Sequence, residues 1–309
     1  MNVTLKDWLK ILPQKNIKLY EPICKHTTFN IGGIADWFIT PSSVNQLVVV
    51  ITFCKQKKLN YFIIGAGSNC LFSDKGFNGV LISLEKFNRC KFDGEFVTVG
   101  AGLKLSTLLS LCLTKCLSGL EFCVGIPATC GGAVTMNAGA YGYEISDFIN
   151  EIWILKNGKI EKLTNSECEF GYRKSRFRVN DEIILKVRFK LLSSKRRLIL
   201  ENMQKFLARR CQTQPHEPSA GSVFKRTETF PAGFLIEQAG LKGLCLGNAK
   251  ISNIHANFIV NLGGATCKEV LSLIEIARNE VYLQFGIILE PEIILIGEKY
   301  EDFRRLSHS

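Results

Sequence analysis

The stretch GLEFCVGIPATCGGAVTMNAGAYG, residues 119–142, holds six glycines and one proline among 24 positions, with Glu121 as its only formal charge. Each glycine costs about 0.5–1 kcal/mol inside a regular helix or strand, so this density is expected where backbone bends sharply or approaches a ligand. Because no Lys or Arg is present, an anionic ligand would be held by backbone N–H groups, in a loop or at a helix N-terminus. A nucleotide cofactor is the first hypothesis, and a ligand-free surface loop is the alternative.

The composition is typical of a globular protein. The chain has 309 residues, of which 46% are hydrophobic and 22% charged, enough for two or three domains and a large core. The N-terminus lacks the uninterrupted apolar segment of a signal peptide, and Thr4 with Asp7 predicts a short capped helix there. The longest apolar runs, such as 47–54, fall short of the ~18 residues that a membrane span needs. We expect a cytoplasmic protein with no membrane segment.

Twelve cysteines are scattered along the chain, and its four histidines are isolated from one another. No Cys-x-x-Cys pair occurs, so we expect neither a zinc site nor another bound metal. Most of the cysteines are expected to serve as small core hydrophobes in a reducing compartment.

The formal net charge of +11 permits two classes of partner, nucleic acid and polyanionic small substrates. Basic residues are denser at 173–178 and 195–210, but no nucleic-acid-binding motif accompanies them. We therefore expect an anionic substrate and no nucleic acid.

The run 61–64 predicts a strand, and GAGSN follows it at residues 65–69. A dinucleotide-binding turn of the Rossmann type would need a third glycine at position 70 and then a helix. Cys70 stands at that position, and the chain continues through a short loop into another apolar run, 80–84. The order strand, loop, strand excludes the Rossmann fold.

The remaining turn and cap signals predict elements of both kinds. Asn157-Gly158 predicts a type I′ hairpin, Thr266 and Glu269 predict a capping box, and Pro291 favours an edge strand. We expect helices over 103–117 (with Gly119 as its C-terminal glycine), within 193–210, over 231–238 and over 267–285, and strands over 151–155, 160–163, 183–192, 249–252, 258–261 and 287–296.

Six motifs then occur in one order along the chain. They are HTTF with IGG (26–33), GAGSN (65–69), GIPATCGGAVTMNAGAYG (125–142), GYRKS (171–175), PSAGSVFK (218–225) and LEPE (289–292). Together they closely resemble the UDP-N-acetylenolpyruvoylglucosamine reductase family over residues 20–298, nearly the whole chain. The compact stretch between Arg210 and Ser222 is similar to the shorter, type II form of that family.

The resemblance implies an α+β fold, with a two-part FAD-binding domain of the PCMH/vanillyl-alcohol-oxidase type and a C-terminal α+β substrate-binding domain. We expect residues 1–80 and 81–194 to form the two FAD-binding parts and residues 195–309 the substrate domain. The implied activity is reduction of UDP-N-acetylenolpyruvoylglucosamine to UDP-N-acetylmuramate in peptidoglycan synthesis, and hence in cell-wall growth, cell shape and cell division. NADPH would reduce bound FAD, and the reduced flavin would reduce the UDP-sugar. A monomer is expected.

Three residues match the family's catalytic positions, namely Arg173, Ser222 and Glu292. In the implied roles, Arg173 pairs with the substrate carboxylate through its planar guanidinium. Glu292, kept protonated beside that carboxylate, donates a hydrogen bond as negative charge develops, and Ser222 supplies the proton to C2. Without the motifs, the same three residues would be interpreted as a solvated cation, a turn hydroxyl and an exposed edge-strand carboxylate.

The resemblance also assigns cofactor and substrate contacts. FAD contacts, made chiefly through backbone, are implied for Gly65, Gly67, Ser68 and Asn69 in one loop and for Gly125, Ile126, Gly131, Gly132 and Val134 in the other. The positions that contact the UDP-sugar are matched by Tyr172, Lys225 and Gln238. The segment 255–257 also matches the family and is expected to be structural.

The chain departs from the family pattern at three places. Arg226-Thr227 replaces an asparagine and a proline, Ala128 replaces a glycine, and Asn30 stands where an arginine is frequent. The replaced asparagine helps to hold the diphosphate, so Arg226 either takes over by charge pairing or turns away.

Two other classes of protein remain as alternatives. A related FAD-dependent oxidase would share the flavin domain but leave Arg173, Ser222 and Glu292 without a joint purpose. A basic nucleic-acid-binding protein would explain the net charge and none of the motifs.

Overall fold

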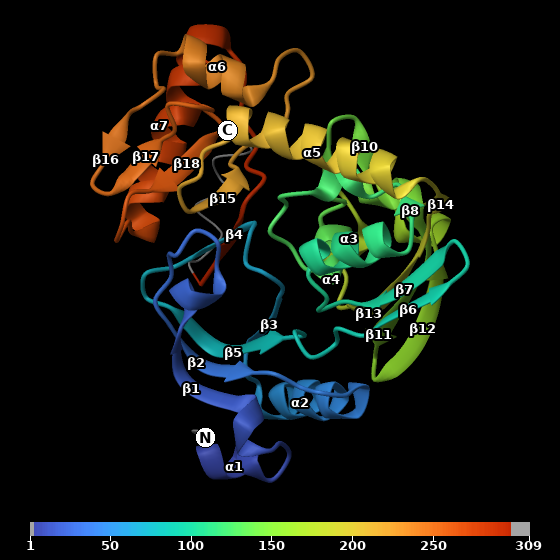
Figure 1. Cartoon of the computed structure of the whole chain (residues 1–309). Coiled ribbons are helices and arrows are strands. Elements are labelled where there is room, and N and C mark those ends of the chain that lie inside the picture. Colours follow the sequence, from blue (N-terminus) through green and yellow to red (C-terminus); the bar gives the residue numbers. More distant parts are fainter. Residues whose placement is uncertain (1–2, 298–309) are drawn as a thin grey trace. The chain divides into compact units, whose positions relative to one another are not determined.

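The computed structural model describes residues 3–297, which contain helices and strands in alternation, a mixed α+β architecture (Figure 1). The described residues form two compact units. Unit 1 comprises 3–19, Trp37–Ala66 and Val80–Arg210, and unit 2 comprises Tyr20–Asp36, Gly67–Gly79 and 211–297. Residues 1–2 and 298–309, which belong to the first and third predicted domains, lie outside the described residues. The division at 80 and 194 stays a prediction.

Unit 1 contains a five-stranded antiparallel sheet. Its order is β12-β11-β13-β7-β6, with bounds Lys159–Thr164, Ile149–Lys156, Ile183–Lys190, Phe96–Gly100 and Cys90–Asp93. Asn157 and Gly158 have φ of 49° and 76° and join β11 to β12 with Lys156 opposite Lys159. This geometry confirms the predicted two-residue hairpin.

Two helices and two short ladders accompany this sheet. Helix α4 (Cys130–Thr135) packs on β13 and β7, and α3 (Leu105–Thr114) contacts β8 (Leu117–Ser118). Strand β8 pairs with β14 (Leu192–Ser193), so the strand predicted over 183–192 divides into β13 and β14. The second ladder joins β9 (Gly139–Ala140) to β10 (Tyr143–Glu144).

Helix α3 ends earlier than its sequence predicts. The residue with left-handed backbone after the helix is Cys116, with φ of 57°, so the prediction of Gly119 as the C-terminal glycine is wrong. A Cβ at Gly119 would lie 2.6 Å from a ring carbon of Phe148. Close packing, rather than helix termination, therefore requires glycine at position 119.

A second sheet has the order β1-β2-β5-β3, with bounds Ile17–Pro22, Ile34–Ile39, Phe77–Ser83 and Tyr61–Ile64. Strand β3 pairs in parallel with β5, and no helix lies between these two strands, which confirms the exclusion of the Rossmann fold. Helix α2 (Val44–Lys57) buries Leu47, Val50 and Cys54 in the core that also contains Val80 and Ile82.

The predicted N-terminal helix is present as α1 (Leu5–Leu9). The N–H and hydroxyl of Thr4 donate to the Asp7 carboxylate over 3.0 and 2.8 Å, which confirms the predicted cap. At the other end of unit 1, α5 (Arg196–Thr213) buries only Ile199 among its eighteen residues. Its residues up to Arg210 belong to unit 1.

Unit 2 contains the antiparallel sheet β15-β18-β17-β16, with bounds Ser219–Ser222, Phe258–Asn261, Ala249–Ile251 and Cys245–Leu246. Helix α7 (Cys267–Phe285) packs on β17 and β16 and contacts α6 (Ala232–Gln238) (Figure 1). The capping box of α7 is confirmed, because Thr266 Oγ1 accepts from the N–H of Glu269 and Glu269 Oε2 accepts from the N–H of Thr266. Asp74 accepts from the N–H groups of Cys267 and Lys268 over 2.8 and 3.1 Å.

The final strand is shorter than predicted. Only β19 (Ile294–Ile296) forms a ladder, parallel to β4 (Cys70–Phe72), while the segment before it makes one isolated bridge, between Phe224 and Pro291. Proline has no N–H to donate, so a regular ladder cannot run through position 291.

Candidate active site

The two predicted FAD loops meet in unit 1 at Gly65. A Cβ built on Gly65 would lie 2.8 Å from Thr129 Oγ1 and 3.7 Å from Gly132 Cα. Gly65 is exposed, so the contact is open to a ligand on its other side. The structure thus brings Gly65 and Gly132 together, at a spacing that only glycine at position 65 allows.

The N-terminus of α4 is already hydrogen-bonded within the chain. The N–H groups of Cys130 and Gly131 donate to the carbonyls of Leu103 and Ala101, both over 2.8 Å, and that of Gly132 donates to Thr129 Oγ1. A ligand anion could use these three donors only by breaking internal hydrogen bonds. Of the two predicted anion-binding modes, helix N-terminus and loop, the structure therefore favours the loop.

Glycines 131 and 132 lie inside α4, contrary to the expectation that so many glycines have no place in a helix. A Cβ at Gly131 would lie 2.8 Å from Ala101 Cβ and 3.1 Å from Ala101 O. The close approach of α4 to residue 101 therefore requires glycine there. Val134, on the same helix, is fully buried in the core, whereas Ile126 is partly buried.

Gly125 contacts a basic side chain of unit 1. Its φ is 78°, and a Cβ there would lie 2.7 Å from Arg210 Cδ. Arg210 Nε donates to the carbonyl of Val124 over 3.0 Å. The start of the second predicted FAD loop is therefore held by α5.

Arg173 is tied to the glycine-rich stretch. It occupies a turn closed by hydrogen bonds between Gly171 and Lys174, with a left-handed φ of 52°. Its guanidinium donates to the carbonyl of Gly139 over 3.0 Å and lies 5.3 Å from the centroid of the Tyr172 ring. Tyr172 is half exposed. Because of these contacts, Arg173 is not simply a solvated cation.

Asn137 supports this turn and was not predicted. It is fully buried, its amide nitrogen donates to Glu144 Oε2 over 2.7 Å and to the carbonyl of Gly171 over 2.9 Å, and its amide oxygen accepts from the N–H of Ser146. The only sequence signal was an amide within a stretch of small residues. The carbonyl of Gly171 lies 34 positions along the chain from Asn137, and such a distant contact leaves no local sequence pattern.

In unit 2 the structure brings the segments of Ser222 and Glu292 together. The N–H of Glu292 donates to the carbonyl of Val223 over 2.7 Å, and the N–H of Lys225 donates to the carbonyl of Glu290 over 2.9 Å. Glu292 is 8% exposed, so it is not the exposed edge-strand carboxylate of the alternative interpretation. Arg173 belongs to unit 1.

Asn69 connects the GAGSN loop to the same place. Its amide nitrogen donates to the carbonyl of Glu292 over 3.1 Å, and its own carbonyl accepts from the N–H of Ile294 over 2.9 Å. Gly67 is buried, and a Cβ there would lie 2.4 Å from the carbonyl oxygen of His26. Asn69 is expected to contact FAD, and in this structure its side chain also supports the backbone of Glu292.

The predicted substrate residues of unit 2, Lys225 and Gln238, are accessible at the surface. Lys225 forms an ion pair with Glu290, whereas Gln238 is exposed at the end of α6 and Arg226 is exposed beside Lys225. Ser68 is partly exposed.

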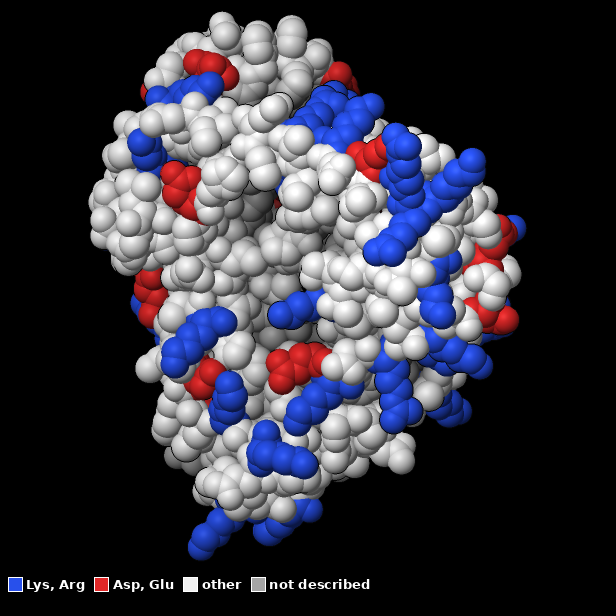
Figure 2. Space-filling model, viewed as in Figure 1, with Lys and Arg blue, Asp and Glu red and all other residues white. Residues whose placement is uncertain are grey.

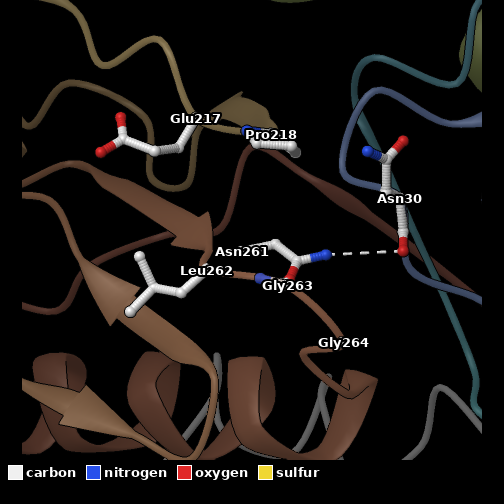
Figure 3. Close-up of a pocket in the computed structure, with 7 residues that line it drawn as sticks. All are labelled: Asn30, Glu217, Pro218, Asn261, Leu262, Gly263 and Gly264. Atoms are coloured by element: carbon white, nitrogen blue, oxygen red, sulfur yellow. Dashed lines mark hydrogen bonds between the residues drawn. The ribbon is translucent and has the colours of Figure 1, made fainter.

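A separate hollow of about 460 Å³ opens in unit 2 (Figure 3). It is lined by Asn30, Glu217, Pro218, Asn261, Leu262, Gly263 and Gly264. Asn261 lies across it and donates to the carbonyl of Asn30 over 3.5 Å. None of the predicted site residues lines this hollow, so the predicted site residues of unit 2 lie in a different part of the unit.

Residues 3–297 contain neither a membrane-spanning helix nor a cluster of metal-ligating side chains. No helix in that range is long and apolar enough to cross a membrane. The same range contains no group of three or more His, Cys, Asp or Glu side chains placed to hold a metal ion.

Comparisons with known proteins cover nearly the whole chain. An FAD binding domain model matches residues 35–164, and a model of the UDP-N-acetylenolpyruvoylglucosamine reductase C-terminal domain matches residues 214–296. A UDP-N-acetylenolpyruvoylglucosamine reductase of Alkaliphilus oremlandii is 43% identical over 95% of this chain and 98% of its own length. One of Clostridium kluyveri is 42% identical over 94% and 96%.

A solved structure agrees with the sequence matches. UDP-N-acetylenolpyruvylglucosamine reductase from Thermus caldophilus superposes with a TM-score of 0.78 at 35% identity, covering 91% of this chain and 98% of that one. These matches confirm the predicted fold class as an α+β protein with an FAD-binding domain and a C-terminal domain. The chain belongs to the UDP-N-acetylenolpyruvoylglucosamine reductase family.

Proposed function

We propose that this protein is an FAD-dependent oxidoreductase that reduces UDP-N-acetylenolpyruvoylglucosamine to UDP-N-acetylmuramate in peptidoglycan precursor synthesis. Its family membership supports this reaction. The structural observation that carries the proposal is the pairing of Val223 with Glu292. That pairing holds a serine and a buried carboxyl on neighbouring segments, as the reaction requires.

The residues around Gly65 fit a bound flavin dinucleotide. A Cβ would run into neighbouring atoms at Gly65 or Gly67 in the first loop and at Gly125 or Gly131 in the second, so backbone packs closely in both loops. The matched FAD model spans Gly65 and residues 125–134. We propose that Gly65, Gly67, Ser68 and Asn69, with Gly125, Ile126, Gly131, Gly132 and Val134, hold FAD. When bound, FAD supplies the hydride-transfer chemistry that no protein side chain can provide.

Hydride addition at C3 of the enolpyruvyl group leaves negative charge over C2 and the carboxylate. The Arg173 guanidinium pairs with that carboxylate, and Glu292 donates a hydrogen bond where the charge develops. The proton at C2 comes from the Ser222 hydroxyl, which is a weak acid but faces a strongly basic enolate. Tyr172, Lys225 and Gln238 contact the UDP-sugar.

Further properties follow from the chemistry of the chain. A net charge of +11 suits two polyanions, the UDP-sugar and NADPH as hydride donor, and Figure 2 shows Lys and Arg spread over the visible face. All twelve cysteines are free, which supports a reducing cytoplasmic location. We propose that the protein acts there as a monomer and that its product serves cell-wall growth, cell shape and cell division.

The test separates the two half-reactions. Purified protein is expected to be yellow, to be reduced by NADPH under anaerobic conditions and to be reoxidised by the UDP-sugar. Ser222→Ala is expected to keep flavin reduction within about twofold and to slow reoxidation roughly 10²–10⁴-fold, the usual contribution of a positioned proton donor. Ser219→Ala, in the same strand, is the matched control and is expected to change neither step.

Four outcomes contradict the proposal. A colourless protein that takes up no FAD would exclude it, and equal slowing of both half-reactions in Ser222→Ala would exclude the proton-donor role. Oxygen consumption with an alcohol substrate would indicate an oxidase. Salt-sensitive DNA binding without flavin would instead indicate a nucleic-acid-binding protein.

A further inference from the structure

The segment that carries Ser222 is held on two sides. On one side it meets residues 290–292 through the hydrogen bonds of Val223 and Lys225. On the other side its strand, β15, pairs with β18, with Ser222 opposite Phe258. Beyond Ser222 the regular pairing ends, because the chain turns at His255–Phe258, where the N–H of Phe258 donates to the carbonyl of His255.

Asn257 continues the pairing where the strand stops. Its backbone carbonyl accepts from the N–H of Val223 over 2.8 Å. Its side-chain oxygen accepts from the N–H of Phe224 over 2.9 Å, and its side-chain nitrogen donates to the carbonyl of Phe224 over 2.9 Å. One amide thus satisfies both backbone groups of Phe224, as a neighbouring strand residue would.

The environment makes these hydrogen bonds important. Asn257 is 7% exposed and Phe224 2%, so water cannot replace a lost partner, and an unsatisfied buried group costs about 1–3 kcal/mol. Phe224 is also the residue that bridges to Pro291. A shift of Phe224 would therefore move Ser222 relative to Glu292.

We propose that Asn257 is a positioning residue that sets the place of the Ser222 hydroxyl relative to Glu292, and so the protonation of the substrate at C2. It touches neither substrate nor cofactor in this role. The inference rests on the proposed function. It goes beyond that function in assigning a specific step to a residue outside the catalytic motifs.

The chain provides a matched control at the other end of β18. Asn261 is 4% exposed. Its amide nitrogen donates to the backbone carbonyls of Phe29 and Asn30 over 2.9 and 3.5 Å, and its amide oxygen accepts from the N–H groups of Gly263 and Ala265. None of these partners belongs to residues 218–225, the serine segment. Asn261→Ala is therefore expected to lower the stability of the protein as Asn257→Ala does, but to leave the position of Ser222 unchanged.

The first measurement is hydrogen exchange by mass spectrometry, which needs neither substrate nor turnover. Asn257→Ala is expected to speed amide exchange in residues 223–225 and 290–292 at least tenfold, whereas Asn261→Ala leaves these segments within about twofold of the original protein. Unchanged exchange in Asn257→Ala would overturn the proposal, whatever the enzyme does.

The second measurement separates the half-reactions in the flavin-loaded protein. Asn257→Ala is expected to leave reduction by NADPH within about twofold, to slow reoxidation by the UDP-sugar on the order of 10–100-fold, and to increase the solvent isotope effect on that step. Equal slowing of both steps, or no slowing, would overturn the positioning role. If Asn257→Ala does not fold, Asn257→Asp replaces it. This variant keeps the acceptor for the N–H of Phe224 and loses the donor to its carbonyl. Selective slowing of reoxidation would again support the positioning role, and equal slowing or none would overturn it.

The two proposals fail in different ways. If the original protein holds flavin but the UDP-sugar does not reoxidise it, the proposed function fails while the exchange measurement still reports on Asn257. If the original protein turns over and Asn257→Ala behaves as Asn261→Ala does, only the positioning role fails.

Discussion

Gly65 is the residue whose replacement tests the meeting of the two loops most directly. We expect Gly65→Ala to weaken FAD retention by about tenfold or more, because the new methyl group would lie 2.8 Å from Thr129 Oγ1 and displace it. Flavin fluorescence during dilution measures the loss. The double variant Gly65→Ala/Thr129→Ala removes the obstructing oxygen and is expected to recover part of the FAD retention. The loss of the Thr129 helix cap costs about 1 kcal/mol, so the recovery is incomplete. No recovery in the double variant would show that another contact is responsible.

Single residues also show where sequence reasoning succeeds and where it stops. The caps at Thr4 and Thr266 and the turn at Gly158 were predictable because their signals lie within four positions of the contacts they make. The supporting amides of Asn137 and Asn257 bind backbone groups more than thirty positions away. Nothing in the local pattern distinguishes such an amide from an ordinary polar side chain.

At the scale of an element, the loop after Arg173 is fastened by a buried ion pair. Arg176 donates to both oxygens of Glu182 over 2.8 and 2.6 Å, and Lys156 lies 3.0 Å from the same carboxylate. The hydrogen bonds from Arg176 hold the pKa of Glu182 below its ordinary 4.5. The pair fixes the loop that begins at the Tyr172–Arg173 turn.

We expect Glu182→Gln to lower the free energy of unfolding by about 3 kcal/mol at pH 7, because Arg176 loses its charge partner. A depressed folded-state pKa gives stability that is complete above the unfolded-state value of 4.5 and is lost as pH falls through the folded-state value. The difference between the two proteins should therefore shrink below pH 4.5. Urea unfolding at several pH values measures it.

The control for that experiment is Glu201→Gln. Glu201 pairs with Arg197 at the surface of α5, and such pairs contribute about 0–1 kcal/mol. An equal loss of stability in both variants would contradict the buried role of Glu182.

Elements also explain the two wrong boundaries. The strand predicted over 287–296 has the right composition, but Pro291 cannot donate to a ladder, so only Ile294–Ile296 pairs regularly with β4. The helix predicted over 103–117 stops before Cys116, which adopts the left-handed backbone at a non-glycine residue. The first break follows from the missing N–H of proline, and glycine at position 119 is required by packing against Phe148 and not by the end of the helix.

For the whole molecule, the cysteines give a simple test. Seven are buried and three are exposed, namely Cys116, Cys211 and Cys245, and burial raises the pKa of thiols such as Cys70 and Cys112 to about 12. We expect a thiol reagent at pH 8 to label the three exposed cysteines within seconds to minutes and the seven buried cysteines only on unfolding. Reductant should leave the melting temperature unchanged, and a reductant-dependent shift would indicate a disulfide.

The pairing of residues 290–292 with the serine segment also bears on the order in which the protein is made. The ribosome releases residues 218–225 several seconds before their partners at 290–292, at ordinary rates of synthesis. Both edges of residues 218–225 are unpaired until Asn257 and β18 follow, and one edge then stays unpaired until residues 290–292 are made. An unpaired edge is a surface on which other chains can aggregate. A nascent chain stalled before residue 290 should therefore depend on chaperones. The complete chain, once released from the ribosome, should not.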